Sequence, residues 1–198
     1  QLFEDFEGDT FPPEGWLVTS VSNYPGNSWT RIEALTTPPV VFNGNYAAFV
    51  NGLENIGPSN TAEKWLISNP TTITGNSVLS FWSRPTINGF QNTTYQIRVS
   101  TVDQFSGFQL VASWTEAQLT EVFNICEEKT VPLSGLSGQQ VYIAFVMVFT
   151  QPTTALGGDR WLIDNVALVE QCIDPINPTA SNFSLTGATL SWGNPGGA

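Results

Sequence analysis

Clusters of Gly, Pro and Asn divide this chain into short runs of β-branched and aromatic residues, and that pattern limits its possible folds more than any other feature. In the run Thr94–Thr101, apolar and polar residues alternate, as in a strand with one face in a core and one in water. The run Val141–Phe149 is apolar throughout and predicts a central strand covered on both sides. Only Thr115–Leu119 could form a helical turn. We therefore expect an all-β protein.

The predicted strands share this composition and end at turn-forming residues. They are Leu2–Glu7, Trp16–Thr19, Trp29–Glu33, Tyr46–Asn51, Lys64–Ser68, Ser77–Ser83, Thr94–Thr101, Gln109–Trp114, Val122–Val131, Gln140–Thr150 and Arg160–Glu170.

The charge balance excludes several classes of partner. Seventeen acidic residues against six basic ones give a formal net charge of −11. Such a charge repels phosphate backbones and anionic lipid surfaces, so we expect no nucleic-acid binding. No apolar run reaches the roughly 18 residues of a transmembrane helix, so we expect no membrane insertion.

The composition also argues against catalysis. The chain contains no histidine, which excludes Ser–His, Cys–His and histidine–metal centres. A pair of carboxyl groups could still hydrolyse glycosides. However, strand alternation sends Glu4 and Asp5 to opposite faces, and Glu127 and Glu128 likewise diverge. We therefore predict a domain that is not an enzyme.

Several short motifs occur in an order that resembles a known family. They are Phe3 to Trp16 (FEDFEGDTFPPEGW), Gly26 to Trp29 (GNSW), Gly44 to Phe49 (GNYAAF), Glu63 to Ile73 (EKWLISNPTTI), Leu79 to Trp82 (LSFW), Val141 to Val146 (VYIAFV) and Asp159 to Leu168 (DRWLIDNVAL). The set resembles the cleaved-adhesin and choice-of-anchor J domains of bacterial surface proteins, which are distantly similar to MAM domains and to carbohydrate-binding jelly rolls. The resemblance implies a galactose-binding-like jelly-roll β-sandwich of two antiparallel sheets.

The resemblance also implies a setting. Such domains occur on secreted or cell-surface multidomain proteins, often from Bacteroidetes, where they serve adhesion, carbohydrate binding or haemagglutination. Others are accessory modules of secreted proteases and glycosidases. We therefore expect a non-catalytic module whose partners are a glycan or a host or cell-surface protein, together with other domains of the same polypeptide. A protein-interaction or spacer module is the alternative.

The pattern changes after Glu170, where a Pro-containing segment leads to a turn signal and a strand at Ala188–Trp192. This stretch resembles the start of a fibronectin type III domain, which needs roughly 90 to 100 residues in full. We therefore predict a jelly-roll domain at residues 1–171. Residues 172–198 are predicted to be a linker and the truncated start of a second domain.

Asp164 is the first candidate for a special role. In a regular strand it would share a face with Leu162, Val166 and Leu168. A lone buried carboxylate is costly unless it is paired or bound to a metal.

Jelly rolls similar to this one bind calcium with an N-terminal Glu and an Asp from the last strand, and calcium favours carboxylate and carbonyl oxygens. The resemblance thus implies a structural calcium held by Glu7 and Asp164, with Asn45 or Gly44 adding oxygen; Asp9 is a weaker candidate. The alternative is that Glu7 caps a turn and Asp164 binds backbone amides.

Aromatic residues in loops are the candidates for binding a ligand, since the apolar face of a sugar stacks on a ring. They are Tyr24, Phe90, Phe105 and Phe108, each of which could instead cap an end of the sandwich. The aromatic residues expected in the core are Trp65, Phe81, Trp82, Phe145 and Trp161.

The two cysteines leave two possibilities open. Cys126 and Cys172 could form a disulfide in an exported protein, or remain two unpaired thiols.

Overall fold

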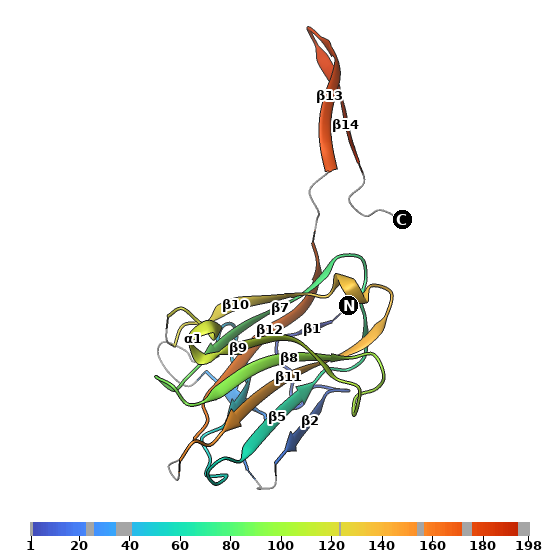
Figure 1. Cartoon of the computed structure of the whole chain (residues 1–198). Helices are drawn as coiled ribbons and strands as arrows, with labels where there is room; N and C mark the ends of the chain where they lie inside the picture. The colour runs from blue at the N-terminus through green and yellow to red at the C-terminus, as the bar shows by residue number, and fades with distance from the viewer. Residues whose placement is uncertain are drawn as a thin grey trace.

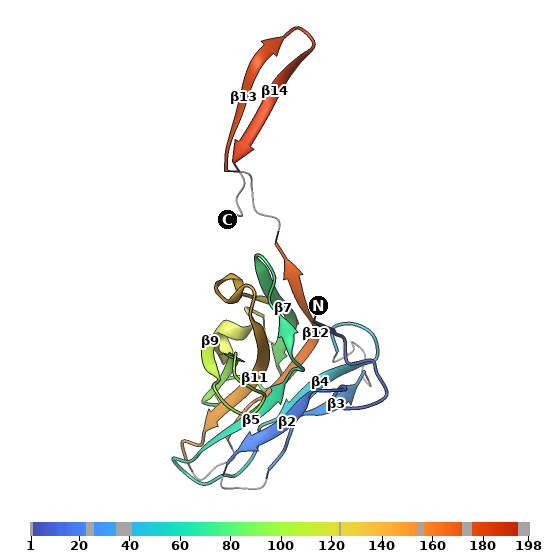
Figure 2. The ribbon, with the colours of Figure 1, turned by 90° about the vertical axis from the view of Figure 1, so that its right-hand side faces the viewer.

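The protein is a β-sandwich of two antiparallel sheets that lie face to face (Figures 1 and 2). The computed structural model describes residues 2–22, 26–34, 41–122, 124–153, 157–171 and 176–193. None of the helices in these ranges is long and apolar enough to cross a membrane. The predicted all-β jelly roll is confirmed.

Each sheet contains six strands, all paired antiparallel. The first has the order β10 (Glu127–Pro132), β7 (Ser77–Pro85), β12 (Arg160–Glu170), β4 (Tyr46–Asn51) and β3 (Thr30–Glu33), with β1 (Phe3–Glu4) also paired to β12. The second has the order β2 (Leu17–Val21), β5 (Thr61–Ile67), β11 (Gln140–Thr150), β8 (Thr93–Ser100) and β9 (Gln109–Thr115), with β6 (Thr71–Thr72) also paired to β11.

The core lies between the sheets and is rich in aromatic rings. Phe145 meets Phe81 edge to face at 5.1 Å between ring centroids, and Tyr95 meets Trp161 at 5.2 Å. The Trp161 indole donates to Ser83 Oγ at 2.7 Å, so its one polar group is satisfied inside the core.

The central strand β11 is covered on both faces, as its apolar run predicts. Phe145 and Met147 belong to the core, whereas Ala144 and Val146 belong to a second cluster on the outer face of the same sheet.

The bounds of β4, β11 and β12 agree with the sequence predictions, and α1 (Glu116–Leu119) forms after its N-cap Thr115 where a helical turn was expected. A 3-10 turn, Ser134–Leu136, was not predicted, and neither was β6.

Two predicted strands are too long. The strand predicted to run to Glu7 ends at Glu4, because the Glu4 carboxylate accepts the Phe6 amide at 2.7 Å and Phe6 turns the chain with φ 59°. The strand predicted from Val122 begins at Glu127, whose carboxylate accepts the Val122 amide at 3.4 Å in a turn.

Beyond the sandwich, β13 (Ile176–Ser184) and β14 (Gly187–Gly193) pair with each other in a two-stranded sheet. The predicted strand at Ala188–Trp192 is confirmed, but β13 was not predicted. The domain boundary at residue 171 stays a prediction.

Candidate functional site

A β-bulge in β12 sets the direction of the Asp164 side chain. The register between β12 and β7 shifts between Asp164 and Ala167, and Asn165 within the shift has φ 47°. A bulge inserts an extra residue and so reverses which face the following side chains occupy.

The expectation that Asp164 shares a face with Leu162, Val166 and Leu168 is therefore only partly right. Leu162, which precedes the bulge, packs outside the core with Val41 and Ala47. Val166 and Leu168, which follow it, belong to the core. Asp164 thus lies under the loop at residues 41–45. Of the three aliphatic residues, only Leu162 shares its face of the strand.

Asp164 binds backbone amides of that loop. Its Oδ2 accepts the N–H groups of Phe42 at 3.2 Å and Asn43 at 3.0 Å, and its Oδ1 accepts that of Asn165 at 2.8 Å. Asp164 is fully buried. Burial is the main cause that raises its pKa to about 6, and the negative charge of Glu7 adds to the rise, whereas the amide hydrogen bonds oppose it.

Glu7 holds the other end of the same loop. Its Oε1 accepts the amides of Asn45 and Tyr46, both at 2.8 Å, and its Oε2 accepts from Asn45 Nδ2 at 3.4 Å. Gly44 directly precedes Asn45 and has φ 68°, and a side chain there would collide with the Glu7 carboxylate. The structure thus brings Glu7, Gly44 and Asn45 together and places Asp164 under the same loop.

These residues fit a hard divalent cation by their charge. The ion pairs found among the described residues are Lys64–Glu54, Arg98–Glu63 and Lys129–Glu127, and none involves Glu7 or Asp164. Two carboxylates that contact one loop thus form no ion pair among the described residues, although Arg31 lies nearby, where it donates to the Gly8 carbonyl and lies 4.0 Å from the centroid of the Tyr46 ring. Within the described ranges, no three Asp, Glu or Cys side chains converge for a metal, so backbone or amide oxygens would have to supply further ligands.

A second candidate site lies on the outer face of the sheet that contains β8. Here the loop between β8 and β9 presents Phe105 to solvent, with 80% of its surface exposed. Asp103 Oδ1 accepts the amides of Phe105 at 2.8 Å and Ser106 at 2.6 Å. These bonds, the Phe105 amide first, lower the pKa of Asp103. Ser100 Oγ donates to the Ser106 carbonyl at 2.6 Å, so hydrogen bonds within the loop fix its conformation.

Gln104 fastens the same loop to the sandwich. Its Nε2 donates to the Gly15 carbonyl at 2.9 Å and to the Ser68 carbonyl at 3.0 Å. The exposed ring of Phe105 is therefore carried on a loop whose shape is fixed, and a fixed loop loses little entropy when a ligand binds.

Phe105 and Phe108 line a groove of about 320 Å³. Its floor includes Trp65, on which the Phe108 ring stands edge to face at 5.3 Å, and its far wall includes Leu17 and Val21 of β2. The structure thus brings together two of the four predicted ligand-binding aromatics and adds Trp65.

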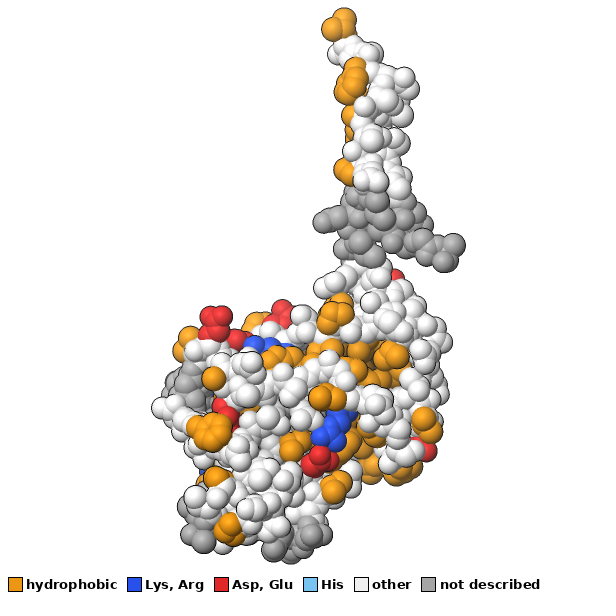
Figure 3. Space-filling model, viewed as in Figure 1, with side chains coloured by type: hydrophobic (Ala, Val, Ile, Leu, Met, Phe, Trp, Pro, Cys, Tyr) orange, Lys and Arg blue, Asp and Glu red, His pale blue; other side chains and the backbone are white. Residues whose placement is uncertain are grey.

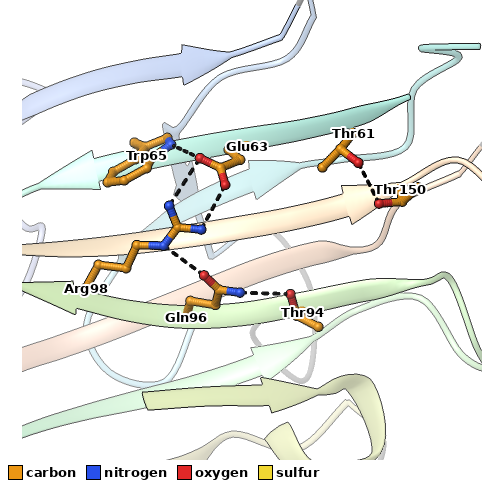
Figure 4. A network of polar contacts seen from close by, with 7 residues as sticks. All are labelled: Thr61, Glu63, Trp65, Thr94, Gln96, Arg98 and Thr150. Carbon is orange, nitrogen blue, oxygen red and sulfur yellow. Dashed lines mark hydrogen bonds and ion pairs between the residues drawn. The ribbon is translucent and has the colours of Figure 1, made fainter. Parts of the chain in front are cut away.

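A polar strip continues from the groove along β5 and β8 (Figure 4). Glu63 binds Arg98 through both oxygens, at 2.8 and 3.2 Å, and also accepts the Trp65 indole N–H at 3.0 Å. Arg98 Nε donates to Gln96 at 2.8 Å, and Gln96 donates to Thr94 at 3.4 Å.

On the face shown in Figure 3, one basic cluster lies directly beside an acidic one, with hydrophobic side chains around them. The Arg98 guanidinium carbon lies 4.7 Å from the centroid of the Trp65 ring. The face therefore combines rings and hydrogen-bonding groups with no net charge from the Arg98–Glu63 pair.

The remaining candidates lie elsewhere. Phe90 lies in the loop before β8, at the opposite end of that strand from Phe105. Tyr24 lies outside the described residues, as does Cys172. Cys126 is a free, half-buried thiol, and burial raises its pKa to about 11.

Two of the five aromatics expected in the core are not there. Trp65 lies on the outer face of its sheet, and Trp82 stacks on Phe42 at 3.7 Å, outside the core cluster. Buried Lys64 explains the first error: it takes the inward position next to Trp65, where alternation predicts an apolar residue.

The sequence matches no protein-family model and no curated protein. The K1 cleaved adhesin domain of Lys-gingipain from Porphyromonas gingivalis W83 superposes with a TM-score of 0.62 at 18% identity, over 86% of this chain and 98% of that one. The carbohydrate-binding module TmCBM61, in complex with β-1,4-galactotriose, gives a TM-score of 0.52 at 15% identity, over 84% and 94%. The fold is that of the cleaved adhesins and carbohydrate-binding modules.

The same fold also occurs inside enzyme chains. The CBM22-1–GH10 modules of Clostridium thermocellum xylanase 10B, complexed with xylohexaose, match with a TM-score of 0.53 at 12% identity, over 86% of this chain but 28% of that one. The predicted resemblance to cleaved adhesins and carbohydrate-binding jelly rolls is confirmed for the fold.

Proposed function

We propose that this chain is a non-catalytic binding module that recognises an uncharged glycan on the outer face of the sheet that contains β8. The observation that carries the proposal is Phe105, an exposed ring on a hydrogen-bonded loop beside the groove floored by Trp65. An exposed ring that the protein holds in place offers a stacking surface at little entropic cost.

The polar strip supports a sugar as the ligand. Arg98, Gln96 and Thr94 offer donors and acceptors in a row, which suits a chain of hydroxyl groups. Glu63 neutralises Arg98, and the net charge of −11 disfavours acidic sugars. Structural neighbours crystallised with β-1,4-galactotriose and with xylohexaose are consistent with this class of ligand.

A glycan array tests the function. The full chain should bind one or more neutral oligosaccharides saturably, and Phe105→Ala should remove the signal while the melting temperature stays unchanged. Binding of proteins but of no oligosaccharide would contradict the proposal and favour the protein-interaction or spacer alternative.

We also propose that Glu7 and Asp164 hold a structural calcium ion with oxygen from Gly44 or Asn45. Support comes from their shared loop and from the lack of a basic partner for either carboxylate among the described residues. Such an ion would tie the N-terminal segment to β12. An exported, multidomain parent protein is part of the same proposal.

A further inference from the structure

A second hollow lies at the opposite end of β8 from the glycan face, which is the outer sheet face that carries Phe105, Phe108 and Trp65. It has a volume of about 350 Å³ and is formed by the loop between β7 and β8 on one side and by α1 and the turn after it on the other. Phe90 and Ile87 supply apolar surface from the loop, and Ala117 supplies it from the helix. Glu116 and Glu121 line the same hollow.

Two buried or partly buried carboxylates, Asp159 and Glu116, fix the loop that carries Phe90 by accepting its backbone amides. The Ile87 amide donates to Asp159 Oδ1 at 2.9 Å, and the Gln91 amide donates to Glu116 Oε1 at 3.1 Å. Phe90 lies between these two anchors, and 78% of its surface is exposed. Its ring is thus presented to solvent by a short, fastened loop rather than folded into the sandwich.

The negative charge of the hollow comes from Glu116 and Glu121, which both line it. Among the described residues, neither Glu116 nor Glu121 forms an ion pair. Lys129, which donates to the α1 carbonyl of Gln118 at 3.4 Å, is paired with Glu127 at 3.2 Å. Within the described residues the two carboxylates therefore have no cationic partner, although Glu116 Oε1 accepts the amides of Gln91 at 3.1 Å and Thr93 at 2.7 Å.

We propose that this hollow binds a lysine or arginine side chain of a partner protein. An aliphatic stem packs against Phe90, Ile87 and Ala117, and the cationic head lies over the ring of Phe90 and beside Glu116 and Glu121. The chain's charge of −11 favours encounter with a basic surface. The site is separate from the glycan face, so one module can hold a sugar and a protein at the same time.

The test uses the full ¹⁵N-labelled chain and follows its amide resonances by NMR. The probes are Nα-acetyl-lysine methylamide, its uncharged norleucine analogue, and n-butylamine. We expect saturable shifts confined to residues 86–92 and 116–121 with the lysine probe, weaker binding of the norleucine probe, and loss of the shifts at high salt.

Three variants locate the contacts. Glu116→Gln keeps an oxygen for the Gln91 amide but removes the charge, and Glu121→Gln removes the second charge. Each should weaken the lysine probe about fivefold, as expected for a partly exposed charge pair. Phe90→Ala should weaken both amino-acid probes, whereas Glu33→Gln, an exposed carboxylate on β3, should change nothing.

Several outcomes would overturn the inference. No shift up to the solubility limit of the lysine probe would do so, as would equal affinity for norleucine. Because n-butylamine carries the same stem and ammonium as the lysine side chain, it should shift the same amides; its failure to do so would mean that the lysine probe binds through its blocked backbone and would overturn the inference. Because Phe105→Ala leaves this hollow intact, failure here and failure of glycan binding can be told apart.

Discussion

Arg98 and Glu63 form a two-point ion pair on the outer face of the second sheet, with N–O distances of 2.8 and 3.2 Å. The same carboxylate fixes the Trp65 indole, so one acidic side chain orients a guanidinium plane and an aromatic ring together. The arrangement needs the fork of arginine, which lysine cannot reproduce. The role of the Arg98–Glu63 pair can therefore be tested by a substitution that keeps the charge but removes the fork.

Arg98→Lys should weaken oligosaccharide binding about tenfold, because the donors to Gln96 and to the ligand are lost. Its effect on the free energy of unfolding should stay below about 1 kcal/mol, since pairs that are partly exposed stabilise little. Urea denaturation and binding isotherms measure the two quantities. A large loss of stability with unchanged affinity would assign the pair a structural role.

Lys64 and Glu54 form a buried ion pair at 3.0 Å, with side-chain exposures of 1% and 9%. Glu54→Ala should cost about 3–5 kcal/mol of unfolding free energy, because it leaves a buried ammonium without a partner. The double variant Lys64→Met, Glu54→Leu should recover most of that loss. Urea denaturation checks both, and a single variant within about 1 kcal/mol of the parent would contradict this explanation.

Removal of metal should destabilise the chain. With EDTA, the melting temperature of the parent protein should fall by several degrees and recover when calcium is added. Glu7→Gln and Asp164→Asn should lower the melting temperature and abolish the response to either reagent. Glu7→Gln is the safer variant, because Gln retains an acceptor for the Asn45 and Tyr46 amides. An unresponsive parent protein would mean that the carboxylates serve only to bind backbone amides.

The Cys126 thiol should react slowly. Burial raises its pKa from 9.0 to about 11, so near pH 8 roughly a thousandth of it is thiolate. In a Cys172→Ser variant, iodoacetamide should modify Cys126 at least tenfold more slowly in the folded protein than in urea. The folded state holds this proton more tightly than the unfolded chain, so stability should decline as the pH rises from about 9 to about 11. Equal modification rates would contradict the buried position.

The strand pattern predicts the sandwich well, because alternation and apolar runs report directly on burial. The bounds of β11 and β12 follow from it. The bulge after Asp164 does not, since Trp161, Leu162 and Ile163 are apolar on both faces of the strand and give no phase from which the shift could be read; the bulge reverses the faces of Val166 and Leu168. The positive φ of Asn165, a residue type that tolerates this conformation, is the only local signal.

The candidate ligand face was predicted in part. Phe105 and Phe108 were found from their loop, because the surrounding Ser and Gly exclude a regular strand. Trp65 was missed because buried Lys64 occupies the inward position beside it, and its partner Glu54 comes from a different segment. Phe90 was likewise predicted to bind a ligand; it lies at the other end of β8 from Phe105, and only the topology shows this.

Stacking of a sugar on Phe105 can be measured by isothermal titration calorimetry with the oligosaccharide selected on the array. Phe105→Ala should weaken the affinity at least tenfold, as truncation of a central aromatic contact does. Phe183→Ala, which removes a ring of similar exposure from β13, should leave it unchanged. Equal affinity in both variants would rule out stacking on Phe105 and move the binding site away from this face.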